Sequence, residues 1–319
     1  MDYSAYLKDK GRFISEFGWQ APPTLELLKE YIEPGDLYPY SKTMEAHNKQ
    51  KEGQERLYRF LAAHYPVPES IKRFTLYCQL NQAEALKTAV EHWRTRMFKT
   101  GGCLIWQLED CWPVTSWSLI DYGLNLKASY YFVKRAFQQI ISPLLIKDGK
   151  AYIYIVNETG EELRANLRFS IIDFYGETYY SEIVSVSVPP YTSKLVIERS
   201  LDKLLLSSDR VLSVVLEKDG NTIYEDAKTV QEPKHLKLPK PNIKIETLKS
   251  DTAKFKVSLR SDVYAKAVWM RLNEVKAKFN DNFFDILPRK SKTIEVSTEK
   301  DLSLSEFKSL LKIEAYPYN

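Results

Sequence analysis

The first 141 positions carry apolar residues mainly at the three- and four-residue spacing of amphipathic helices. One predicted helix follows Thr24, whose hydroxyl can cap the first turn. Two longer helices are also predicted, and Gly101 and Gly102 are expected to end the first of them. The predicted apolar faces are, in chain order, Leu25, Leu28 and Ile32; Leu80, Ala83, Leu86, Val90, Trp93 and Met97; and Leu126, Tyr130, Val133, Phe137 and Ile140.

Two short apolar runs around Ile14 and Ile105 are the predicted strands of this part. The run "CLIWQL" (103–108) is bounded by glycine, so we expect a strand buried on both faces. The order strand, helices, strand, helix is typical of a parallel α/β barrel, and Pro143 ends it. A barrel needs eight strands, and two would leave unpaired edges. We therefore interpret residues 1–141 as the C-terminal portion of a TIM (β/α)8 barrel, with the remaining strands encoded upstream.

After residue 142 the apolar spacing falls to two in short runs, such as "KAYIYIVN" (150–157) and "KFKVSLRS" (254–261), which predict strands. Turn pairs such as Tyr175-Gly176 and Asp219-Gly220 separate them, which is typical of β-sandwiches. We predict one immunoglobulin-like sandwich over residues 142–235 and a second over residues 236–319. The proline- and lysine-rich stretch 232–244 is expected to be a solvated linker, and a polyanion-binding patch is the less favoured alternative. The predicted fold class is α/β plus all-β.

Composition excludes several classes of function. The 319 residues are 44% hydrophobic and 28% charged, with a net charge of +4, so nucleic-acid binding is not expected. No apolar run is long enough to span a membrane, and the N-terminal stretch lacks the apolar centre of a signal peptide, so a cytoplasmic location is expected. Cys78, Cys103 and Cys111 fit no metal or redox spacing and are expected to be buried thiols. No metal-ligand cluster or phosphate-binding loop is found, so no metal or cofactor is predicted.

The stretch "RFISEFGWQ" (12–20) contains one carboxylate, Glu16, at the end of an apolar run. Spacing alone favours a strand-end glutamate paired with a neighbouring arginine, but Glu16 could also be half of a catalytic carboxylate pair. His47 and Asn48 are similarly open between sugar-hydroxyl contacts at a barrel mouth and a capped surface loop.

Four segments together carry a resemblance that spans nearly the whole chain. They are "FISEFGWQAPP" (13–23), "NQAEALKTAVEHWR" (81–94), "GGCLIWQLEDCWPVTSWSLIDYGLNLKASYYFVKRAF" (101–137) and "FNDNFFDILP" (279–288). In this order they resemble family 2 glycoside hydrolases, and they are most similar to β-mannosidases. The resemblance implies the C-terminal part of a five-domain enzyme, with two domains and most of the barrel upstream.

The resemblance also implies roles for individual residues. Glu16 corresponds to the nucleophile of retaining hydrolysis, and Trp106 to a wall of the subsite that holds the cleaved mannose. Glu109 and Asp110 stand where the family usually has Asn-Asp, so they are expected near the substrate. Glu109 could read a sugar hydroxyl or be a solvated charge, and Asp110 leans towards a structural hydrogen bond. No residue here matches the acid/base glutamate of the family.

The implied substrate is a β-mannoside or a related oligosaccharide, and the implied partner is an upstream polypeptide, with self-association as an alternative. An exo-β-glucosaminidase-like specificity and a non-catalytic sugar-binding or interaction role remain as alternative functions. Without the acid/base residue, the isolated chain is expected to be inactive.

Overall fold

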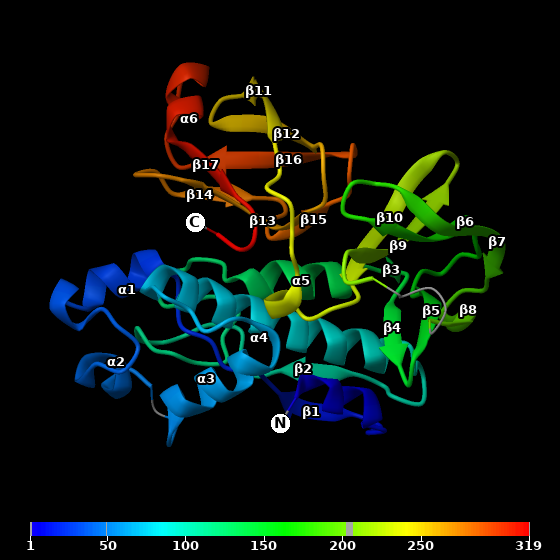
Figure 1. Ribbon diagram of the computed structural model, residues 1–319, viewed down its shortest axis with the longest axis horizontal. Coiled ribbons are helices and arrows are strands. Elements are labelled where there is room, and N and C mark those ends of the chain that lie inside the picture. The colour runs from blue at the N-terminus through cyan, green and yellow to red at the C-terminus, as the bar shows by residue number, and fades with distance from the viewer. Residues whose placement is uncertain (1, 49, 202–206, 319) are drawn as a thin grey trace.

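The computed structural model describes residues 2–48, 50–201 and 207–318. It contains a helical layer with a two-stranded sheet and two β-sandwiches (Figure 1). The helical part comprises η1 (Tyr3–Lys8), β1 (Ile14–Phe17), α1 (Leu25–Tyr31), η2 (Pro34–Asp36), α2 (Lys42–Ala46), α3 (Gly53–His64), α4 (Ile71–Arg94), β2 (Cys103–Ile105) and α5 (Ala128–Ala136). Strands β1 and β2 pair in parallel, as the chain order predicts.

The predicted helices are present, but their ends differ from the expectation. The Thr24 hydroxyl accepts a hydrogen bond from Leu27 N and caps α1. Helix α4 ends at Arg94, well before the glycines, so Met97 lies outside it. Helix α5 ends at Ala136, and Ile140 belongs to a strand rather than to the helix. Both residues still pack on an apolar core, which explains why they matched the helical spacing.

The prediction for "CLIWQL" is wrong in its burial. The strand covers Cys103–Ile105, and the side chains of Leu104, Trp106 and Leu108 are 55%, 52% and 61% exposed. Helices cover one face of the β1–β2 sheet, and no described segment covers the other. A run that is apolar on both faces therefore has one face open to solvent here.

The first sandwich follows the predicted alternation closely. Its strands are β3 (Ile140–Ile141), β4 (Leu144–Lys147), β5 (Lys150–Asn157), β6 (Leu163–Asp173), β7 (Thr178–Val188), β8 (Thr192–Ser200), β9 (Arg210–Lys218) and β10 (Asn221–Thr229). One antiparallel sheet has the order β10-β9-β6-β7, and in the other β3, β4 and β8 pair with β5. The two sheets enclose a core of their own, which includes Ile153, Phe169 and Val214.

The second sandwich is smaller. It comprises β11 (Ile243–Asp251), β12 (Lys254–Ser261), β13 (Ala265–Leu272), β14 (Ala277–Phe279), β15 (Phe284–Ile286), β16 (Ser291–Thr298), α6 (Leu304–Leu310) and β17 (Leu311–Glu314). One sheet has the order β11-β12-β16-β14 and the other β15-β13-β17. Their facing side chains form a separate core, in which the rings of Phe255 and Phe307 stack at 4.0 Å.

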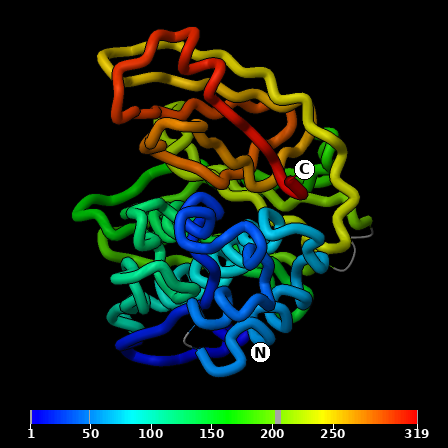
Figure 2. Tube along the Cα trace, turned by 90° about the vertical axis from the view of Figure 1, so that its left-hand side faces the viewer, coloured from blue at the N-terminus to red at the C-terminus, as the bar shows by residue number. Residues whose placement is uncertain are grey.

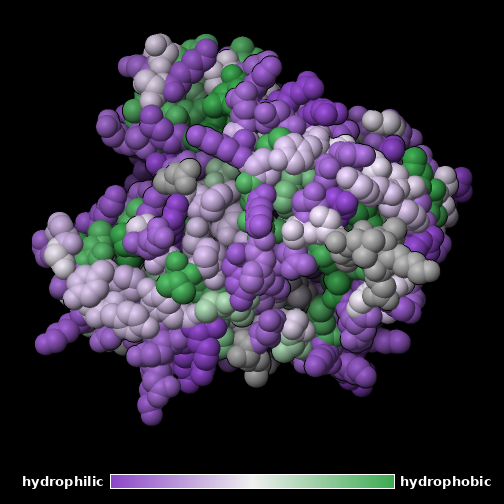
Figure 3. Space-filling model, viewed as in Figure 1, coloured by the Kyte–Doolittle hydropathy of each residue, from purple (hydrophilic) through white to green (hydrophobic). Residues whose placement is uncertain are grey.

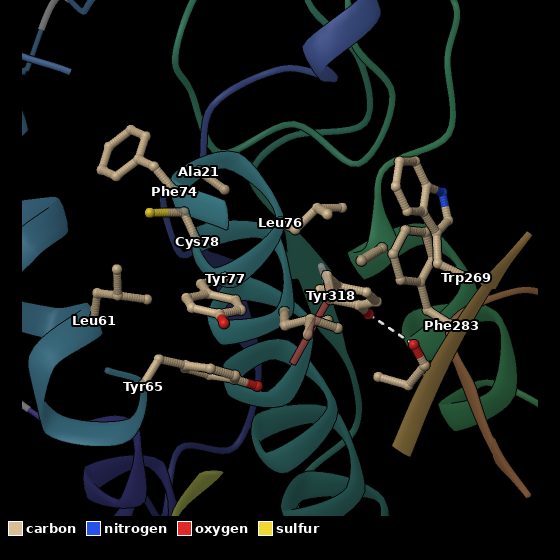
Figure 4. Packing of buried hydrophobic residues seen from close by; sticks show 14 of the residues in the cluster. Ala21, Leu61, Tyr65, Phe74, Leu76, Tyr77, Cys78, Trp269, Phe283 and Tyr318 are labelled. Carbon is tan, nitrogen blue, oxygen red and sulfur yellow. Dashed lines mark hydrogen bonds between the residues drawn. The ribbon is translucent and has the colours of Figure 1, made fainter. Parts of the chain in front are cut away.

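A further apolar core, the shared core, joins the second sandwich to the helical layer, which it overlies (Figure 2). Trp269, Phe283 and Tyr318 of the sandwich part pack with Leu80 and Tyr77 of α4. Figure 4 shows these rings and the hydrogen bond from the Tyr318 hydroxyl to the Ala267 carbonyl oxygen, 2.7 Å long. The second sandwich and the helices therefore fold against each other.

The stretch 232–244 is not the solvated linker that composition predicts. It begins with η3 (Pro233–His235) and lies against α3. The Lys234 ammonium donates to the Ala62 carbonyl oxygen at 2.7 Å, Glu232 contacts His64 Nδ1 at 2.8 Å, and Leu238 packs against the shared core. Proline prevents regular strands here, but side-chain contacts still dock the segment.

The surface is mostly polar, and the three cysteines differ in burial. The face in Figure 3 is mainly hydrophilic, with apolar residues in small, separate groups. Within the described ranges, no helix is long and apolar enough to cross a membrane. All three cysteines are free, but Cys78 alone is buried, whereas Cys103 is half-buried and Cys111 exposed. The expectation of three buried thiols is therefore wrong for two of them.

Candidate active site

The two faces of the β1–β2 sheet have different surroundings. Ile14, Phe17, Cys103 and Ile105 pack towards α4 and α5, in a cluster with Trp93 and Val133 among others. Leu104, between Cys103 and Ile105, is exposed, and so is Glu16, which lies with the exposed Ser15 between Ile14 and Phe17, where the pairing register shifts. We call this second side, with Glu16, Leu104, Trp106 and Leu108, the open face.

Glu16 lies on the open face at the end of a firmly held strand. The next residue, Phe17, packs edge-on against Trp93 with ring centroids 4.6 Å apart, and its carbonyl oxygen accepts a 2.7 Å bond from Trp106 N. The Glu16 carboxylate has no hydrogen bond or ion pair within the described part of the chain. The arginine partner of the structural alternative is therefore not found among these residues.

Gly18 allows the Glu16 and Trp106 segments to approach each other. A Cβ atom at Gly18 would lie 2.1 Å from the Trp106 carbonyl oxygen and 3.1 Å from Cδ1 of the Trp117 ring. The first distance is far inside van der Waals contact, and backbone cannot swing aside as a side chain can. The glycine in "SEFGW" is thus required by the neighbouring strand end.

Trp106 directly follows β2, and its backbone N–H donates to the carbonyl oxygen of Phe17, the residue after Glu16. Its side chain is 52% exposed, and the peptide bond that follows it, to Gln107, is cis. A large aromatic ring left half exposed provides a flat apolar surface. Such a surface suits the apolar side of a pyranose ring.

Asp110 closes the loop after β2 instead of facing solvent. It is buried, and its two oxygens accept hydrogen bonds from Ser116 Oγ at 2.6 Å and Ser118 Oγ at 2.7 Å. Gln107 Nε2 adds a third bond at 3.2 Å. The geometry favours the structural role of Asp110 over direct substrate contact, whereas the neighbouring Glu109 is exposed and free to reach a ligand.

Polar side chains of the helical layer anchor the segments after both strands. Gln82 Nε2 donates to the Trp19 and Ser118 carbonyl oxygens, at 2.8 and 3.1 Å. Lys127, fully buried at the start of α5, donates to the Ala21 carbonyl oxygen at 3.1 Å. Burial lowers the pKa of Lys127 to about 8, although the charges of Asp110 and Asp121 oppose the shift. Sequence patterns did not indicate these anchors, because a buried glutamine or lysine looks like a surface residue in a helical period.

His47 and Asn48, whose role the sequence left undecided, lie beside the loop after β2. His47 Nδ1 contacts the Pro113 carbonyl oxygen, and the His47 carbonyl oxygen accepts a 2.8 Å bond from Thr115 N. Asn48 Oδ1 accepts a 2.7 Å bond from Gln20 Nε2. Both residues therefore hold the loop after β2: the His47 ring and the Asn48 Oδ1 atom are engaged there, whereas the buried Asn48 Nδ2 has no hydrogen-bond partner among the described residues.

The described residues contain no group of three or more His, Cys, Asp or Glu side chains arranged to hold a metal ion. The chemistry available on the open face is that of one carboxylate and one aromatic wall. The sequence pattern offers no residue as the second carboxyl group that acid catalysis would need.

Two domain families match the C-terminal half of the chain. Residues 149–235 match a family described as a mannosidase Ig/CBM-like domain, and residues 238–316 match one described as an Ig-fold domain. Both sandwiches are therefore Ig-like.

Similar proteins cover nearly the whole chain. A β-D-mannosidase structure from Dictyoglomus thermophilum is 36% identical, with a TM-score of 0.93 over 99% of this chain and 39% of that one. Beta-mannosidase B from Thermothelomyces thermophilus is 29% identical over 90% of this chain, and its Aspergillus niger counterpart 27% over 90%. An exo-chitosanase from Amycolatopsis orientalis, 16% identical with a TM-score of 0.78, shares the fold. The chain spans 37% and 36% of the two curated relatives.

Proposed function

We propose that this chain, which resembles the C-terminal part of a family 2 glycoside hydrolase of the β-mannosidase type, is the nucleophile-bearing part of a retaining, exo-acting β-mannosidase. In this proposal Glu16 attacks the anomeric carbon of a β-mannoside, and Trp106 forms a wall of the subsite for the cleaved sugar. Glu109 contacts the substrate from the loop, and Asp110 holds that loop in place. No cofactor takes part.

The observation that carries the proposal is the position of Glu16. A retaining glycosidase needs a carboxylate beneath the anomeric carbon and an acid group about 5 Å away. Glu16 is exposed, unpaired among the described residues and fixed at the end of a parallel strand, where barrel enzymes carry their catalytic groups. Trp106, whose backbone bonds to the residue after Glu16, adds a half-exposed indole that supports a sugar pocket.

The open face supports the second half of the proposal, that further barrel strands complete the site. Three large apolar side chains, Leu104, Trp106 and Leu108, are more than half exposed there. Two paired strands with unpaired outer edges do not form a closed barrel. We infer that a polypeptide outside these 319 residues supplies the remaining strands and the acid/base carboxyl, and that self-association is the alternative way to cover the face.

The test is a pair of variants in the completed enzyme, produced with the upstream barrel strands in the same or a neighbouring reading frame. Glu16→Gln should abolish hydrolysis of p-nitrophenyl β-mannoside without changing assembly, since the amide is nearly isosteric but a poor nucleophile. Glu161→Gln, an exposed glutamate in a turn of the first sandwich, is the matched control and should keep full activity. Near wild-type rates with Glu16→Gln would make Glu16 a structural residue.

The isolated chain should show essentially no turnover. General-acid assistance is worth about 10²–10⁴-fold, and the absent pocket walls would also be needed for positioning. A panel of nitrophenyl glycosides on the completed enzyme separates mannosidase activity from glucosaminidase activity. Calorimetry with mannose, together with an activity assay with and without the upstream polypeptide, distinguishes both from a non-catalytic chain.

A further inference from the structure

A short helix packs behind the strand that carries Glu16. Helix η1 (Tyr3–Lys8) precedes β1, and one of its central residues, Tyr6, packs against the cluster that contains Phe17 and Trp93. This cluster lies on the helix-covered side of the β1–β2 sheet, and the open face is the opposite side. Tyr6 therefore reaches Glu16 only through the strand itself, from behind.

Tyr6 contacts both residues that follow Glu16. Its ring packs edge-on against the Phe17 ring, with centroids 5.9 Å apart, and its hydroxyl donates to the Gly18 carbonyl oxygen at 3.2 Å. The Trp93 ring of α4 closes a triangle, since its centroid lies 5.7 Å from that of Tyr6 and 4.6 Å from that of Phe17. Burial raises the pKa of Tyr6 to about 12, so the hydroxyl keeps its proton and remains a donor at neutral pH.

Helix η1 is fixed at both of its ends. At the start, the Tyr3 ring stacks on the ring of His64, the last residue of α3, with centroids 4.1 Å apart and planes at 24°. At the other end, the Oδ1 atom of the C-cap residue Asp9 accepts a 3.0 Å bond from Trp93 Nε1. Because the helix is anchored in this way, the Tyr6 hydroxyl can hold its acceptor in a narrow range of positions.

The Gly18 carbonyl is where this support meets the segment after β2. The Trp106 carbonyl oxygen lies only 2.1 Å from the place of a Cβ atom at Gly18, so the two backbones are in close contact there. Among the described residues, the Gly18 carbonyl oxygen accepts a hydrogen bond from Tyr6 alone. Without that bond, the peptide after Phe17 is free to tilt, and the Glu16 carboxylate moves with its strand.

We propose that Tyr6 is a positioning residue for Glu16, and that its hydroxyl holds the end of β1 in the position from which the carboxylate attacks the anomeric carbon. The role of Tyr6 rests on the proposed function of Glu16. Rates of attack depend steeply on position, since a displacement of about 1 Å can cost about 10²-fold. Removal of one hydroxyl should cause a smaller displacement and a loss of about tenfold.

The experiment compares Tyr6→Phe with the wild type in the completed enzyme, using 2-deoxy-2-fluoro-β-mannosyl fluoride. Its C–F bond breaks as Glu16 forms an ester with the anomeric carbon, and fluoride leaves. Tyr6→Phe should lower the rate at saturating reagent about tenfold and leave the half-saturating concentration within about twofold, because the hydroxyl acts on attack and not on binding. The final amount of labelled enzyme counts the competent sites, so a smaller folded fraction is not mistaken for slower attack.

A matched variant and a second readout separate positioning from packing. Tyr3→Phe removes a hydroxyl of the same helix that has no hydrogen-bond partner among the described residues, and it should react at the wild-type rate. Hydrogen exchange in the 319-residue chain needs no catalysis. The Trp106 amide, which donates to the Phe17 carbonyl oxygen, should exchange faster in Tyr6→Phe than in the wild type.

Slower labelling together with faster Trp106 exchange in Tyr6→Phe supports the proposal. A wild-type labelling rate in Tyr6→Phe, with the label on Glu16, would overturn the role of Tyr6 and leave the proposed function intact. Equal slowing in Tyr3→Phe, or unchanged Trp106 exchange in Tyr6→Phe, would also overturn that role. A label on another carboxylate in the wild type would overturn the proposed function itself, and the role of Tyr6 with it.

Discussion

The helical layer has two sides that differ in how far their apolar side chains are buried. Towards the second sandwich, Leu80 of α4 is 1% exposed and lies in the shared core with Tyr77 and Trp269. On the open face, Leu104 is 55% exposed. Leu80 stands among polar residues and Leu104 in a more continuous apolar run, so local pattern would predict the opposite contrast.

The difference lies in what covers each side. The shared core is closed by rings and by hydrogen bonds across the contact, such as Tyr77 Oη to the Pro317 carbonyl oxygen at 2.8 Å. Arg135 of α5 adds two bonds, both 3.1 Å long, to the carbonyl oxygens of Asn282 and Phe283. The open face has apolar side chains but no described partner, and it also carries Glu16. The side left uncovered is thus the side with the candidate chemistry.

A matched pair of leucine substitutions gives the largest expected contrast. Leu80→Ala should lower the free energy of unfolding by about 3–5 kcal/mol, because it leaves a cavity in the shared core. Leu104→Ala should cost less than about 0.5 kcal/mol in this chain, since its side chain is already in solvent. Urea unfolding of both variants measures the difference. Equal losses would mean that the open face is covered in solution.

A pH-dependent contrast is expected where α4 meets the first sandwich. Burial raises the pKa of Glu91 from 4.5 to about 7, although Lys87 opposes the shift. The unfolded chain releases this proton first, so stability falls as pH rises from about 4.5 to 7, by roughly 2–3 kcal/mol. Glu91→Gln should remove this loss, because Lys87 keeps its 2.7 Å contact with Asp226.

Urea unfolding at pH 5 and pH 8 measures the Glu91 effect. The free energy of unfolding of the wild type should be lower at pH 8 than at pH 5 because of Glu91. In Glu91→Gln the difference between the two pH values should be smaller. Glu16→Gln is the control, because Glu16 is exposed on the open face. A wider gap in Glu91→Gln would show that the Glu91 charge stabilises the junction.

The smallest contrast comes from two tyrosine hydroxyls. Tyr318→Phe removes the bond to the Ala267 carbonyl oxygen within the shared core and should cost about 1–2 kcal/mol. Tyr122 is 42% exposed, so Tyr122→Phe should leave stability unchanged within about 0.5 kcal/mol. Thermal unfolding of the two variants and the wild type measures the loss of stability in each. A similar loss for both would contradict the assignment of Tyr122 to a solvent-facing site.

Several of the longer sandwich strands could be predicted from the sequence, because alternation and turn pairs are local signals. Lys150–Asn157 and Lys254–Ser261 match the predicted runs in full. The open face could not be predicted from its residues, since an apolar strand looks the same whether or not its partner strands are present. Burial of Lys127 and of the Asp110 loop depends on contacts distant in sequence, so their roles emerged with the fold.

Glu16 is proposed as the group that bonds to the sugar, and covalent trapping tests this proposal most directly. The completed enzyme is treated with 2-deoxy-2-fluoro-β-mannosyl fluoride, from which fluoride leaves as the carboxylate forms an ester with the anomeric carbon. Mass spectrometry of the digest should find the fluoromannosyl group on the peptide that contains Glu16 and stoichiometric loss of activity. A label on another carboxylate, with Glu16 unmodified in an inactivated enzyme, would contradict the account.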